Sequence, residues 1–77
     1  MIPYKGYLIQ GKAVRVHPNV PQWWRSRGDI LVNTGKTSIN VKHLEGVIFE
    51  SQRLAEAHGR DLCKEWVDEN LEASDDV

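Results

Sequence analysis

Hydrophobic residues recur at helical spacing over residues 51–71. At 100° per residue they gather on one side of a helix, and charged residues fall on the other side. Ser51 is expected to cap this helix, because its hydroxyl can accept a hydrogen bond from a first-turn amide that has no carbonyl partner. The pattern predicts one amphipathic helix over residues 51–71, with an apolar stripe made of Leu54, Ala55, His58, Gly59, Leu62, Cys63 and Trp66.

Gly59 lies near the centre of that stripe. A glycine costs about 1 kcal/mol relative to alanine inside a helix, so its presence at the buried face needs a reason. We interpret it as the point at which the helix approaches a sheet closely, with Trp66 covering the sheet further along.

Three segments before the helix have the composition and alternation of strands. The first covers residues 7–17 and contains Gly11, which leaves open one strand with a bulge or bend and two short strands joined by a turn. The uninterrupted apolar residues on either side of Gly11 favour one bent strand. The second covers residues 23–33, and a turn at Gly35 leads into the third, which begins at Ser38 and is expected to end at Glu45 and Gly46.

Alternation assigns the residues of these strands to two faces. In the second strand the even-numbered set, with Trp24 and Ile30, suits a face covered by the helix, and the odd-numbered set suits an exposed face. Which of Trp23 and Trp24 is buried depends on this assignment. The third strand alternates as Ile39, Val41 and His43 on one face against Ser38, Asn40 and Lys42 on the other. His43 is then expected at the edge of the core.

The order of these elements predicts a two-layer α+β domain: a three-stranded antiparallel meander with one C-terminal amphipathic helix packed on one face. Residues 1–6 are expected to be a lead-in and residues 47–49 a short link to the helix. The domain covers residues 1–71, and the acidic residues 72–77 are expected to form a disordered tail. The second face of the sheet has nothing in the chain to cover it.

Charge divides the chain into two unlike halves, although the net charge is only −1. Residues 1–42 contain seven Lys or Arg and one acid, a net +6, and residues 43–77 contain three Lys or Arg and ten acids, a net −7. Such a division indicates either attraction between a basic sheet and an acidic helix or a basic face that binds an anionic partner.

The chain offers little chemistry for catalysis. Its one cysteine, Cys63, cannot form an internal disulfide, and we expect it to be a small buried residue in a reducing compartment. The three histidines are far apart and lack metal-site spacing, and no phosphate-binding loop occurs. With no leader and no long apolar run, we expect a cytoplasmic, non-enzymatic protein with no metal, no small-molecule cofactor and no membrane association.

The candidate binding surface is the open sheet face. We expect it to contain an exposed tryptophan among basic and polar residues: Trp23, Arg25, Arg27, Asn40, Lys42 and Lys12. Tryptophan and arginine are common where proteins meet, so this face predicts an interaction module that binds a protein partner or a second copy of itself. The alternative is a small nucleic-acid-binding regulator that stacks bases on Trp23, although the acidic half weakens the field that a polyanion would feel.

Two further stretches support the topology. The stretch Tyr4-Lys5-Gly6-Tyr7-Leu8-Ile9 comes first, and Phe49-Glu50-Ser51 opens a helix that carries Ala55 and ends in Trp66-Val67-Asp68. Together they resemble small bacterial proteins of unknown function with a β-β-β-α topology. The resemblance implies that topology, a bacterial or phage origin and an uncharacterised role, and it carries over no functional residue.

Overall fold

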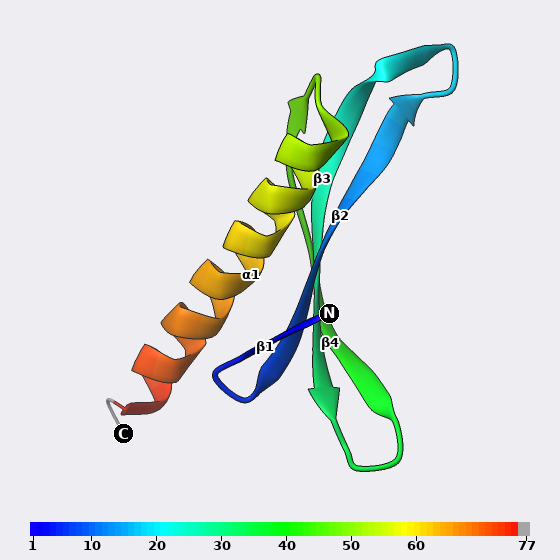
Figure 1. The fold of residues 1–77 in the computed structure, drawn as a ribbon. Helices are drawn as coiled ribbons and strands as arrows, with labels where there is room; N and C mark the ends of the chain where they lie inside the picture. The colour runs from blue at the N-terminus through cyan, green and yellow to red at the C-terminus, as the bar shows by residue number, and fades with distance from the viewer. Residues whose placement is uncertain (76–77) are drawn as a thin grey trace.

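A computed structural model describes residues 1–75 and shows a two-layer α+β domain (Figure 1). One antiparallel sheet has the strand order β1-β2-β3-β4, and α1 packs across one of its faces. The elements are β1 (Ile2–Tyr4), β2 (Tyr7–His17), β3 (Val20–Asn33), β4 (Ser38–Phe49) and α1 (Gln52–Asp75). The predicted fold class, antiparallel sheet and C-terminal helix are confirmed. The predicted number of three strands is wrong, because the described residues form four.

The additional strand, β1, comes from the residues that were expected to be a lead-in. Tyr4 pairs with Tyr7, so Lys5 and Gly6 alone make the turn. Both have positive φ, 48° and 90°, as a two-residue turn must when it follows the right-handed twist of a hairpin. Asp68 of α1 accepts hydrogen bonds from the Tyr4 hydroxyl at 3.0 Å and from Lys5 Nζ at 2.6 Å. These bonds fasten the hairpin to the helix.

Glycines line the contact between α1 and the sheet. Gly11 and Gly28 pair across β2 and β3, and β2 runs through Gly11 in regular register, so Gly11 is neither a turn nor a bulge. A Cβ on Gly59 would overlap the carbonyl oxygen of Arg27, and a Cβ on Gly28 would lie 2.5 Å from Cys63 Sγ. The prediction that Gly59 marks a close approach to the sheet is confirmed.

The helix begins where it was predicted to begin. Ser51 Oγ accepts a hydrogen bond from the Leu54 amide at 3.3 Å, and the Ser51 carbonyl accepts one from the Ala55 amide at 3.1 Å. Leu54 was expected on the buried stripe but is 55 % exposed. The buried face instead follows a four-residue spacing through Ala55, Gly59, Cys63 and Val67.

The C-terminal end of α1 lies beyond the predicted end. The helix continues past residue 71 to Asp75. Of the acidic tail, residues 76–77 lie outside the described part of the chain, and the disorder expected for the tail stays a prediction.

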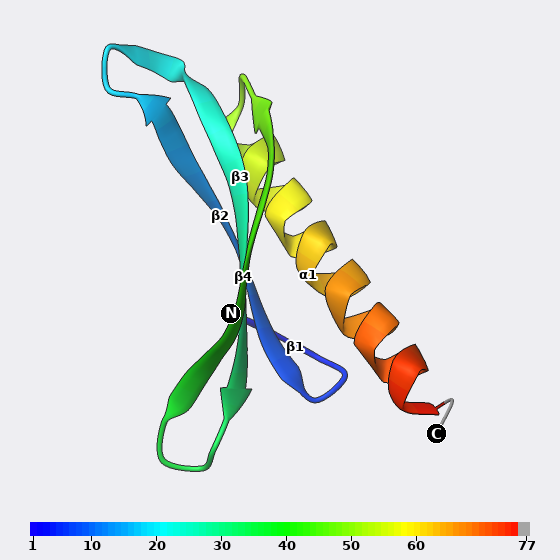
Figure 2. The same ribbon diagram turned by 180° about the vertical axis from the view of Figure 1, so that it is seen from behind.

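The hydrophobic core is small and lies between α1 and the sheet. Edge-to-face contact between the rings of Tyr7 and Trp66, with centroids 6.0 Å apart, closes it near the β1–β2 hairpin. No element covers the other side of the sheet in the described chain (Figure 2), and the molecule measures only 15 Å along its shortest axis. The core comprises Ile9, Ile30, Cys63 and Val67, with Tyr4, Tyr7, Leu44 and Trp66 packed against them.

β4 is longer than predicted. Residues 47–49, expected to be a link to the helix, are the end of this strand. The strand passes Gly46 by means of a bulge, because two residues lie between Glu45 and Ile48 where β3 has one. A β-bulge inserts one residue and bends the strand without ending it, which is why a glycine that resembles a strand terminator lies inside β4.

A second bulge changes which residues of β4 face the helix. Asn40 lies opposite Leu31 and Lys42 lies opposite Ile30, which leaves Val41 as an extra residue. Ile30 is a core residue, so Lys42 lies on the helix side of the sheet. The strict alternation predicted for this strand is therefore wrong, and with it the assignment of Lys42 to the open face.

Candidate functional site

The sheet face opposite α1, called the open face here, follows from the strand register. Residues opposite one another in antiparallel strands point to the same side, and Gly28 and Ile30 of β3 face the helix. The odd-numbered residues of β3 and their partners therefore form the open face. Its three central rows are Gln10, Asp29 and His43, then Lys12, Arg27 and Glu45, then Val14, Arg25 and Ile48.

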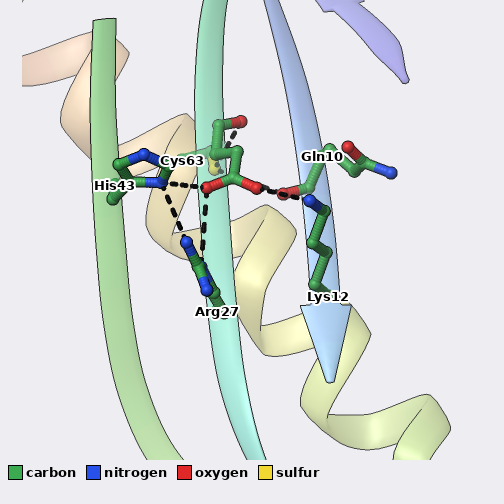
Figure 3. Close-up of polar contacts among 6 residues, drawn as sticks. Gln10, Lys12, Arg27, His43 and Cys63 are labelled. Atoms are coloured by element: carbon green, nitrogen blue, oxygen red, sulfur yellow. Dashed lines mark hydrogen bonds and ion pairs between the residues drawn. The ribbon is translucent and has the colours of Figure 1, made fainter. Parts of the chain in front are cut away.

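A nearly buried carboxylate lies in the middle of this face. The Asp29 side chain is only 4 % exposed although no described element covers it. Figure 3 shows the side chains of Lys12, Arg27 and His43 arranged around the carboxylate that they contact. Lys12 Nζ lies 2.9 Å from Oδ2, and His43 Nδ1 lies 2.5 Å from Oδ1. Arg27 Nε lies 3.7 Å from the same Oδ1. Asp29 thus brings together three strands: Lys12 from β2, Arg27 from β3 and His43 from β4.

The surroundings of Asp29 favour its ionised form. Burial by itself raises the pKa of the carboxyl group, but hydrogen bonds from Lys12 and His43 and the charges of Lys12 and Arg27 outweigh that effect. The pKa of Asp29 is lowered below its ordinary value as a result. The carboxylate is therefore a fixed negative charge that organises the cations around it.

Arg27 is held by charge more than by hydrogen bonds. Its Nε is buried and has no hydrogen-bond partner among the described residues. Its Nη2 lies 3.3 Å from His43 Nδ1, but that nitrogen must carry a proton to donate to Asp29 and cannot then accept one from Arg27. The Arg27 side chain remains 37 % exposed, so part of the guanidinium can reach a partner.

The basic character expected of the open face is largely neutralised within the face. Lys12 and Arg27 pair with Asp29, and Arg25 Nη1 lies 3.7 Å from Glu45 Oε2. The face therefore presents both signs of charge. Sequence reasoning missed the central role of Asp29, although one signal was present: it is the only acid among residues 1–42.

The structure brings most of the predicted binding residues onto this face. Lys12, Arg25 and Arg27 lie together on it, and Asn40 lies at one end, opposite Leu31. Lys42 does not join them, because the bulge at Val41 turns it to the helix side. His43, expected at the edge of the core, instead lies on the open face with a 56 % exposed side chain.

The two adjacent tryptophans have different surroundings. Trp24 is partly buried and its ring lies 5.3 Å from the Arg15 guanidinium carbon, a cation–π contact. Trp23 is the more exposed of the two, at 37 %. Trp23 precedes the last regular β2–β3 pair, Arg15 with Trp24, and lies where the register of the two strands shifts. Val14 and Ile48, each 44 % exposed, lie on the open face in the row of Arg25.

The remaining titratable residues do not assemble into a reactive centre in the described chain. Cys63 is buried, and burial raises the pKa of its thiol, which lies 3.6 Å from the Asp29 carbonyl oxygen. His58 packs its ring against Phe49. No group of three or more potential metal ligands occurs among residues 1–75.

Comparison with known protein families, curated proteins and solved structures finds no match for this chain. The resemblance to small bacterial proteins therefore stays a prediction. In the part of the chain that the structure describes, no helix is both long and apolar enough to cross a membrane.

Proposed function

We propose that this chain is a small non-enzymatic interaction module that docks a protein surface through the open face, and that this surface is a second copy of the chain. The observation that carries the proposal is the composition of the face: Val14 and Ile48 are exposed in the same row as Arg25, and the exposed Trp23 lies two residues before Arg25 in β3. Tryptophan and arginine supply much of the binding energy where proteins meet. A domain with one bare sheet face gains most from covering it.

The charges of the open face support a protein over a polyanion. Each cation there already has a carboxylate nearby, so few positive charges remain to neutralise phosphates. Nucleic-acid binding, the alternative drawn from the sequence, depends on such phosphate contacts. A face that carries both signs can instead complement itself, with Arg25 of one copy against Glu45 of the other.

A concentration series of light-scattering masses tests the proposal with Trp23→Ala and a matched control, Leu54→Ala. Leu54 is an exposed apolar residue on α1, away from the open face. We expect Trp23→Ala to weaken self-association at least tenfold and Leu54→Ala to leave it unchanged. Equal masses for wild type and Trp23→Ala at every concentration would refute self-association through the open face.

A further inference from the structure

β4 forms one edge of the sheet, and no strand lies beside it in the described chain. An uncovered edge offers a row of unpaired amides and carbonyls to another strand. Four apolar side chains are exposed along this edge, between 44 and 56 %: Ile39, Val41, Val47 and Ile48. The edge points sideways from the sheet, and Ile48 is the residue that it shares with the open face.

The opposite edge is better protected against strand addition. β1 pairs only with residues 7–9, which leaves residues 10–17 of β2 uncovered. That stretch carries Lys12 and Arg15, and Pro18 follows it directly; charged residues and proline discourage a new strand from pairing. β4 also carries two charged residues, Lys42 and Glu45, but it contains no proline, and its twelve residues are all uncovered on this side. Of the two edges, β4 is the one open to another strand.

The two bulges of β4 are arranged symmetrically about Leu44. Val41 is the extra residue of the first bulge. Gly46 faces His58 of α1, which makes Val47 the extra residue of the second. Val41 and Val47 are each three positions from Leu44. Bulges usually protect an edge because they bend it away from an incoming strand. A second, antiparallel copy of β4 has its bulges at the matching positions, so the two bent strands can follow one another.

The faces of β4 have the same symmetry. Two antiparallel strands related by a two-fold axis perpendicular to the sheet can pair only residues that lie on the same face. A two-fold axis at Leu44 places Asn40 of one copy opposite Ile48 of the other, and His43 opposite Glu45. All four residues lie on the open face. An axis through Leu44 therefore keeps every open-face residue of β4 on the open face of the pair.

We propose that the β4 strands of two copies pair antiparallel about a two-fold axis at Leu44 and join the two sheets into one. In this pairing Val41 lies opposite Val47 of the second copy, and His43 lies opposite Glu45 of the second copy, each contact occurring twice. A row of main-chain hydrogen bonds forms along the edge. Both helices lie on one side of the joined sheet, and the two open faces become one continuous surface.

A charge-swap experiment on Val41 and Val47 tests this register. Val41→Lys with Val47→Lys places like charges opposite one another twice, whereas Val41→Lys with Val47→Glu places opposite charges there. Both side chains are exposed, so both variants are expected to fold, as circular dichroism would verify. The experiment is done in the Trp23→Ala background, which removes the open-face contact and leaves the edge contact to be measured.

By light scattering we expect Trp23→Ala to have twice the 8.8 kDa monomer mass. In this background, Val41→Lys with Val47→Lys is expected to give monomers, whereas Val41→Lys with Val47→Glu is expected to remain a dimer. Equal masses for the two charge variants would overturn the register, and a monomeric Trp23→Ala protein would overturn edge pairing altogether. The open-face proposal fails by a different result, an unchanged mass on going from wild type to Trp23→Ala.

Discussion

Replacement of Asp29 with asparagine is expected to lower the free energy of unfolding of the domain, because it weakens contacts that lie on the open face. The substitution keeps the size of the side chain and removes its charge, and with it two charge-assisted hydrogen bonds, from Lys12 at 2.9 Å and His43 at 2.5 Å. Breaking a fully buried ion pair by removing one partner costs about 3–5 kcal/mol. Here the Lys12 and His43 side chains are 45 and 56 % exposed, so water resolvates them and the cost falls to about 2 kcal/mol.

Urea unfolding of wild type, Asp29→Asn and Glu45→Gln measures this difference. Glu45 is the matched control, because it is an acid on the same face whose side chain is 64 % exposed and whose ion pair with Arg25 is 3.7 Å long. Its loss is expected to cost less than about 0.5 kcal/mol. For a domain of this size, about 2 kcal/mol corresponds to a fall in Tm of roughly 8–16 °C. An Asp29→Asn protein as stable as Glu45→Gln would refute the organising role of Asp29.

Three further predictions follow from the same contacts. The folded pKa of Asp29 is lowered from an ordinary value of 3.8, so its stabilisation is complete above that value and is lost as pH falls through the lower folded pKa. In thermal melts from pH 7 to pH 2, the Tm of Asp29→Asn should therefore fall less than the Tm of wild type. Equal falls in Tm would contradict this. Gly59→Ala should destabilise by about 1–3 kcal/mol despite better helix propensity, since its Cβ overlaps the Arg27 carbonyl; a urea midpoint at or above wild type would count against the close approach. Ser51→Ala should lower the free energy of unfolding by about 1 kcal/mol, and Ser51→Asp should recover most of that loss. Equal urea midpoints for wild type, Ser51→Ala and Ser51→Asp would show that the cap contributes nothing.

Features fixed by neighbours along the chain could be predicted from the sequence. Ser51 caps the helix by a bond to an amide three residues on, and Gly35 turns the β3–β4 hairpin with φ of 96°. Gly59 could be recognised because a glycine weakens a helix and is favoured on its buried side only where another backbone comes close. The strand β1 was missed because its turn places Lys5, which is not a typical turn residue, at positive φ.

Features that depend on register between distant strands could not be predicted. A bulge adds one residue and exchanges the faces of everything beyond it, and nothing in the sequence around Val41 marks the extra residue. The positions of Lys42 and His43 were therefore assigned to the wrong faces. The Asp29 cluster needed that same register, since His43 reaches the carboxylate only because β4 places it opposite Asp29.

The most direct test of the proposed function is the solution mass of the wild-type chain by light scattering at low and high salt, with tryptophan fluorescence recorded on the same samples. The open face pairs its charges internally and exposes Val14 and Ile48. With both the open face and the β4 edge in contact, we therefore expect an assembly heavier than a dimer, equally stable at both salt concentrations, with one tryptophan shielded from water. A monomer of 8.8 kDa at both salt concentrations, with Trp23 open to an aqueous quencher, would contradict the proposal.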